Sequence, residues 1–153
     1  MTRNSLFTLC VGLLGLATLA SGLADILVWI GGGPGITFGI LEIAGGDFFR
    51  WGWGGAVMVF GGLFMLSGLT NSGSLQQSAN VLLGTIMVGI IAGTDLFALF
   101  CESVPAGEGA PEFFNSIAGC VGGFAPPYPP AILLLPCMLG ILYHICRGPP
   151  DDA

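Results

Sequence analysis

Basic residues are almost absent from this sequence: its 153 residues include three arginines and no lysine, and the formal net charge is -6. The three arginines, Arg3, Arg50 and Arg147, lie far apart along the chain. Nucleic-acid binding needs clustered cations that neutralise phosphates, and attachment to an anionic lipid surface needs a polybasic segment. The composition therefore excludes a nucleic-acid partner and a polybasic membrane-surface patch.

The residues of a self-contained catalytic site are also missing. His144 is the only histidine, so the chain has no pair of histidines to hold a haem or a metal ion. The sequence shows no Ser/His/Asp set and no phosphate-binding glycine loop joined to a basic residue. We therefore expect a protein that is not an enzyme and predict no cofactor, while a bound lipid or quinone stays open.

The five cysteines form no C-x-x-C motif, which argues against a thioredoxin-type pair and a zinc site. Cys101 and Cys120 flank one connector and would form a disulfide if that connector faces an oxidising compartment. One enzymatic hypothesis remains, a quinone-reactive enzyme with a cysteine pair. It would require Cys101 and Cys120 to change redox state with a quinone. The other cysteines lie in apolar stretches and are expected to be packing residues.

Charged residues make up only 8% of the chain, whereas 54% of its residues are hydrophobic. A helix needs roughly 20 apolar residues to cross about 30 Å of hydrocarbon. The chain has four apolar stretches that reach or approach this length: residues 6–30, 51–69, 79–100 and 131–146. Connectors rich in glycine and proline separate them. The fold class predicted is all-α, an integral membrane four-helix bundle that occupies the whole chain, 1–153, as one domain.

The arginines also predict the orientation of the bundle. Arg3 precedes the first apolar stretch and Arg147 follows the last, so the positive-inside rule places both termini in the cytoplasm. Arg50 is the exception, because it lies at the opposite end of the predicted helices. We expect the protein in a prokaryotic cytoplasmic membrane.

The first connector begins with glycines and a proline that cannot remain helical. Its continuation, residues 36–44, is too short to cross a membrane and is predicted to lie at the membrane interface, with Glu42 on the polar face of an interfacial helix. Aromatic and basic residues at helix ends often lie at headgroup depth. The expected interfacial anchors are Trp29, Arg50, Trp51 and Trp53.

Two aspartates, Asp25 and Asp95, are the strongest candidates for a functional site. Each lies inside an apolar stretch, where an ionised carboxylate costs on the order of 2.5–3.5 kcal/mol at full depth. In one interpretation they form a proton-carrying or cation-binding pair near the same membrane face. In the other, each is wetted by headgroup water or hydrogen-bonded within the bundle.

Glycine is abundant in the predicted helices and indicates close helix packing. Gly89 and Gly93 are four residues apart, the spacing of a small-x-x-x-small face that lets membrane helices approach closely. This face could serve the bundle itself or a neighbouring protein. Gly61 and Gly62 are expected to favour tight packing over a wide aqueous pore.

The sequence resembles the DoxX-like family of small four-helix membrane proteins. The resemblance covers roughly residues 6–100 and is carried by three glycine-rich phrases: Gly12-Leu13-Leu14-Gly15-Leu16 continuing to Ser21-Gly22-Leu23, then Gly32-Gly33-Pro34-Gly35, and Gly61-Gly62-Leu63-Phe64-Met65-Leu66-Ser67-Gly68-Leu69. It implies an accessory membrane subunit associated with quinone-linked electron transfer and transfers no catalytic residue. Asp25 stands where a basic residue is expected in that family.

Two functional hypotheses follow. The first is a noncatalytic, accessory transmembrane subunit of a larger membrane complex, such as one of electron transfer or energy conversion, whose partners are other membrane subunits or identical copies, and lipid. The second is a small homo-oligomeric ion or proton channel, or a transporter, that uses Asp25 and Asp95.

Overall fold

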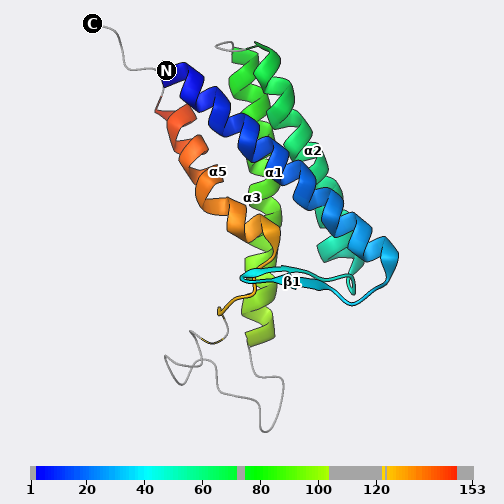
Figure 1. Cartoon of the computed structure of the whole chain (residues 1–153). Coiled ribbons are helices and arrows are strands. Elements are labelled where there is room, and N and C mark those ends of the chain that lie inside the picture. Colours follow the sequence, from blue (N-terminus) through cyan, green and yellow to red (C-terminus); the bar gives the residue numbers. More distant parts are fainter. Residues whose placement is uncertain (1–2, 72–74, 104–121, 123, 148–153) are drawn as a thin grey trace, which may run out of the picture.

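A computed structural model describes residues 3–71, 75–103, 122 and 124–147, and most of these residues are helical. The helices are α1 (Arg3–Gly31), α2 (Gly54–Ser67), α3 (Leu75–Ser103) and α5 (Pro130–Cys146). A π-helical segment, Phe48–Trp53, leads into α2, and a 3-10 turn, Gly68–Asn71, ends it. The start of α1 and the end of α5 lie at one end of the molecule, which we call the terminal end (Figure 1).

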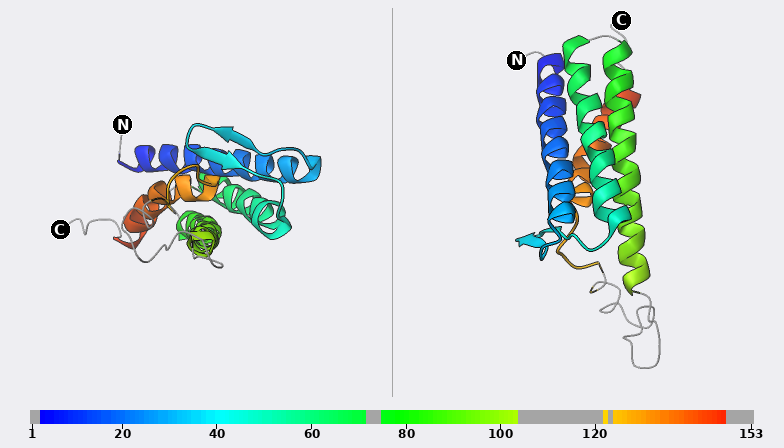
Figure 2. Two further views of the ribbon diagram at one scale, coloured as in Figure 1. Left: turned by 90° about the horizontal axis from the view of Figure 1, so that it is seen from below. Right: turned by 90° about the vertical axis from the view of Figure 1, so that its right-hand side faces the viewer.

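Within the described residues, three helical spans are long and apolar enough to cross a membrane: Ser5–Gly31, Phe48–Thr70 and Leu75–Cys101. The helix α5 is apolar but shorter, at 17 residues. The helices thus form at the four predicted stretches, and α1 and α3 extend beyond the predicted ends. The second view in Figure 2 shows α1, α2 and α3 side by side along most of their length.

Glycines set the distance between α1 and α2. A side-chain carbon added at Gly22 would lie 2.6 Å from the carbonyl oxygen of Gly55, and one added at Gly62 would lie 2.7 Å from the backbone nitrogen of Leu19. Between α2 and α3, a carbon added at Gly84 would lie 2.5 Å from the carbonyl oxygen of Gly61. Only residues without a side chain allow these backbones to approach so closely.

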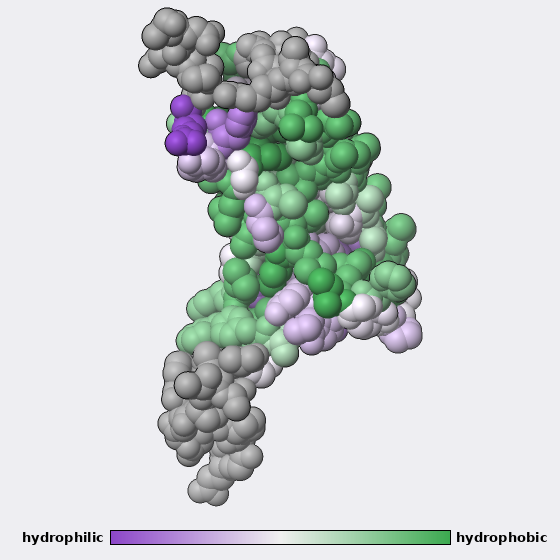
Figure 3. All heavy atoms as spheres, turned by 60° about the vertical axis from the view of Figure 1, so that its left-hand side comes forward, coloured by the Kyte–Doolittle hydropathy of each residue, from purple (hydrophilic) through white to green (hydrophobic). Residues whose placement is uncertain are grey.

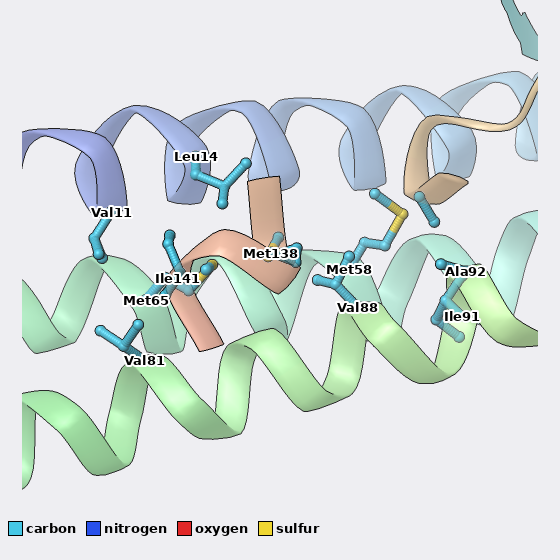
Figure 4. Close-up of a cluster of buried hydrophobic side chains, with 11 residues drawn as sticks. Val11, Leu14, Met58, Met65, Val81, Val88, Ile91, Ala92, Met138 and Ile141 are labelled. Carbon is cyan, nitrogen blue, oxygen red and sulfur yellow. The ribbon is translucent and has the colours of Figure 1, made fainter. Parts of the chain in front are cut away.

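All four helices contribute to one buried apolar cluster. Three methionines, Met58, Met65 and Met138, are among its fully buried side chains. Figure 4 shows the valines, methionines and isoleucines of this cluster lying between the helices. The outward faces are also apolar: Leu27 and Ile30, for example, are each 68% exposed. Figure 3 shows this apolar surface over much of the visible face, as expected for helices that meet lipid tails.

The first connector contains a β-hairpin in place of the predicted interfacial helix. Strands β1 (Ile36–Phe38) and β2 (Leu41–Ile43) pair antiparallel, with Thr37 opposite Glu42. Gly39, at φ 61°, supplies the left-handed conformation of the tight turn. Glu42 is therefore a strand residue, and its backbone N–H donates to the carbonyl of Tyr128 at 2.9 Å.

This hydrogen bond joins the hairpin to the segment that precedes α5. The backbone N–H of Tyr128 donates in return to the carbonyl of Ile40 at 2.7 Å. The hairpin crosses the helices toward the end opposite the terminal end, which we call the hairpin end (Figure 1).

Candidate functional site

The structure brings three charged residues from three helical segments together at the hairpin end. Nε of Arg50, in the π-helical segment, lies 3.5 Å from Oδ1 of Asp95 on α3. Asp25, on α1, is close enough to Asp95 for the two carboxylates to interact electrostatically. We call Asp25, Arg50 and Asp95 the charge cluster.

The two aspartates lie at matching depths. Each is six residues before the end of its apolar span, at Gly31 or Cys101, which corresponds to about 9 Å at 1.5 Å per residue. Both are buried, with 3% of Asp25 and 4% of Asp95 exposed. Neither aspartate is therefore a helix end wetted by headgroup water, while pairing within the bundle, the other part of the second interpretation, describes Asp95 beside Arg50.

The local fold of the π-helical segment positions Arg50. Asp47 precedes this segment, and its Oδ1 accepts the backbone N–H of Phe49 at 2.8 Å and that of Arg50 at 3.4 Å. Such N-terminal capping fixes the first turn of a helix. The guanidinium carbon of Arg50 also lies 5.4 Å from the centre of a Trp51 ring, within the range of a cation–π contact.

Gly55 allows Asp25 to lie against α2. A side-chain carbon added at Gly55 would be 3.0 Å from Cβ of Asp25 and 2.8 Å from the carbonyl oxygen of Gly22. Neither Gly55 nor Asp47 was among the predicted site residues. An aspartate before the Phe48-Phe49-Arg50 sequence is a recognisable capping signal, whereas the role of Gly55 depends on tertiary contacts.

The cluster is incompletely neutralised. Arg50 supplies one positive charge against two carboxylates, and Oδ1 of Asp25 is buried with no hydrogen-bond partner among the described residues. An unpaired charge that is removed from water is costly unless a proton, an ion or a hydrogen-bond donor compensates it. One bound proton or one bound monovalent cation would therefore neutralise the cluster.

The described residues contain no group of three or more His, Cys, Asp or Glu side chains that could hold a metal ion together. Divalent cations prefer several oxygen ligands, commonly six or more for Ca²⁺. Two carboxylates, one of which already pairs with an arginine, are better suited to a single positive charge.

The expected interfacial anchors fall into different environments. Trp53 is 57% exposed on the outer surface, but Trp51 is only 4% exposed and belongs to the protein interior. Trp29 packs on Phe48, with ring centroids 5.2 Å apart. Arg50 pairs with Asp95 rather than standing at the surface alone. The sequence suggested an interfacial role for all four residues because it does not show which side chains of the π-helical segment other helices cover.

The predicted packing glycines also separate into two groups. Gly61 and Gly62 lie against α3 and α1, respectively, whereas a side-chain carbon added at Gly89 or Gly93 would meet nothing within 4 Å. The small-residue face of α3 is thus turned outward. Cys101 is exposed near the end of α3, and Cys120 lies outside the described residues, so their pairing stays a prediction.

No protein-family model, curated protein sequence or solved structure matches this chain. The resemblance to the DoxX-like family accordingly stays a prediction.

Proposed function

We propose that this chain is an integral membrane protein that carries a proton or a monovalent cation at the charge cluster. The observation that supports the proposal best is the buried, unpaired carboxylate oxygen of Asp25 beside the Arg50–Asp95 ion pair. Ionisable residues inside a membrane commonly mark ion or proton pathways, because their cost must be offset by function. Binding of one positive charge neutralises the cluster.

A carrier fits the surroundings of the cluster better than an open pore does. Between the cluster and the terminal end, the described interior is filled mainly by the apolar cluster of all four helices. Polar residues are also buried there. Thr18 and Thr85 each donate to a carbonyl of their own helix, on Leu14 and Val81, at 2.8 Å, and Gln77 is buried near the start of α3. A proton or cation therefore enters at the hairpin end and passes onward only when the helices repack.

The proposed orientation follows from the arginines. Arg3 begins α1 and Arg147 follows α5, so both predicted cytoplasmic charges belong to the terminal end. In a prokaryotic cytoplasmic membrane, the charge cluster then lies near the outer face. The site would load from outside and release into the cytoplasm.

Proton or cation flux in liposomes tests this function. We expect the purified protein to collapse an imposed gradient of protons, Na⁺ or K⁺, and Asp25→Asn to reduce that flux to the level of protein-free liposomes. Glu42→Gln is the matched control, because it removes a half-buried carboxylate on the hairpin. Unchanged flux in a folded Asp25→Asn variant, or no flux in the unaltered protein, would remove the basis of the proposal.

The accessory-subunit hypothesis is favoured by a different observation, the outward face of α3. Gly89 and Gly93 leave open space on this face, so a helix of another subunit or of an identical copy could approach closely. The resemblance to the DoxX-like family supports the same role.

Native mass spectrometry after mild-detergent extraction tests this second function. We expect neighbouring subunits to accompany the unaltered chain and to be lost from Gly93→Leu, which fills the open face. Gly140→Leu, on an open face of α5, is the control and should retain them. Extraction of the unaltered chain as a stable monomer would contradict the accessory role.

A further inference from the structure

A groove lies between α1 and α5, on the half of the molecule nearer the terminal end. Its volume is about 700 Å³, within the range of about 300–1,000 Å³ that is common for small-molecule sites. Leu6, Leu13 and Ala17 line it from α1, and Cys137 and Gly140 line it from α5. The groove remains open partly because Gly140 has no side chain and nothing lies within 4 Å of where its Cβ would be.

The side chains that line the groove are mainly apolar, and a histidine lies at its terminal end. His144, the last residue of α5 to line it, stacks on the ring of Phe7 with centroids 4.6 Å apart. Arg147 follows His144 by three residues and is exposed, with its guanidinium carbon 5.3 Å from the centre of the Tyr143 ring. Figure 3 shows strongly hydrophilic atoms near this end of the visible face and apolar surface beyond them.

Two basic positions lie at the helix ends beside the terminal end of the groove. Arg147 follows His144, the last groove residue of α5, by three residues, and α1 begins at Arg3 at the same end of the molecule. These are two of the three arginines in the chain. A ligand of the groove would therefore combine a long apolar portion with a negatively charged group at one end.

We propose that the groove binds an anionic glycerophospholipid of the cytoplasmic leaflet. One acyl chain lies between α1 and α5, and the phosphate meets His144 and Arg147 at headgroup depth. Basic pockets between transmembrane helices on the cytoplasmic side are suited to anionic headgroups. This is one site between two helices, unlike a polybasic surface patch. Its residues are separate from the charge cluster, and its assignment to the cytoplasmic leaflet rests on the proposed orientation.

Native mass spectrometry of the purified protein, taken from nanodiscs of equal phosphatidylglycerol and phosphatidylcholine, tests the proposal. We expect phosphatidylglycerol to be retained about tenfold more than phosphatidylcholine, because both lipids carry the phosphate but the quaternary ammonium of phosphatidylcholine is repelled by the guanidinium of Arg147. Gly140→Leu should lose most of the retained lipid because the new side chain occupies the groove. Gly93→Leu, also on an open helix face, is the matched control and should retain it.

Arg147→Gln separates the headgroup from the acyl chain. This variant should still retain a phospholipid but lose the preference for phosphatidylglycerol. Cys137→Trp is a second groove-filling variant, at an exposed position. It tests the groove separately if Gly140→Leu does not fold. Three results would each overturn the proposal. The first is equal lipid retention by the unaltered protein and both groove-filling variants, and the second is no preference between the two lipids. The third is a neutral isoprenoid quinone retained in the groove.

Discussion

Gly22→Leu is expected to separate α1 from α2 and to lower the free energy of unfolding by at least about 3 kcal/mol, the upper end of the usual cost of overpacking. The added Cβ would lie 2.6 Å from the carbonyl oxygen of Gly55 and 2.8 Å from the backbone nitrogen of Val59. Backbone atoms in the middle of a helix cannot swing aside as a flexible side chain can, so the two helices must move apart. Unfolding in detergent, followed by circular dichroism, measures the effect.

Gly93→Leu is the control for this experiment. The same change is made on an outward helix face, where an added Cβ meets nothing within 4 Å. Surface substitutions of this kind usually change stability by about 0.5 kcal/mol or less. Equal stability of the two variants would show that α1 and α2 do not approach each other at Gly22.

Arg50→Gln is expected to destabilise the protein by about 3 kcal/mol, the lower end of the cost of removing one partner from a buried ion pair. The lower end applies because the Arg50 side chain is 19% exposed. The loss arises because Asp95 would lose its cationic partner and remain near the second carboxylate, Asp25. The second substitution Asp95→Asn, made in the Arg50→Gln background, should recover part of the lost stability.

A double-mutant cycle of Arg50→Gln and Asp95→Asn measures this coupling, which we expect at about 1–3 kcal/mol. Arg147→Gln is the matched control, because Arg147 is exposed and its described contact is with the Tyr143 ring. Its effect in lipid-free detergent should be about 0.5 kcal/mol or less. Strictly additive effects of the two cluster substitutions would argue against the ion pair.

Hydropathy was sufficient to predict where the helices lie, because each apolar stretch became a helix. It underestimated the lengths of α1 and α3. Gln76 and Gln77, for example, continue α3 beyond the predicted start at residue 79. Polar residues can extend a helix past its apolar stretch because backbone hydrogen bonds do not depend on side-chain hydropathy.

Hydropathy also misassigned residues 36–44. The alternation in Ile36-Thr37-Phe38 and in Leu41-Glu42-Ile43, on either side of Gly39-Ile40, is typical of a short hairpin. A short apolar run does not distinguish an interfacial helix from two strands. The hydrogen bonds with Tyr128, which is distant in the sequence, help to hold the strands in place.

The candidate site was predictable only in part. Asp25 and Asp95 could be selected because a carboxylate in an apolar stretch is costly. Their partner Arg50 was instead assigned to the interface, since its position depends on the turn that Asp47 caps. The contribution of Gly55 could not be foreseen, because it rests on how closely α1 approaches α2.

The shortness of α5 has a consequence for the surrounding bilayer. Its 17 residues extend about 26 Å, less than the hydrocarbon thickness of about 30 Å, whereas the 29 residues of α1 extend about 44 Å. Because α5 ends level with the start of α1, the deficit falls at the hairpin end (Figure 1). In the proposed placement, this hydrophobic mismatch thins the outer leaflet beside α5. Headgroups and water are thereby drawn inward on the side of the protein where Asp25 and Asp95 are buried.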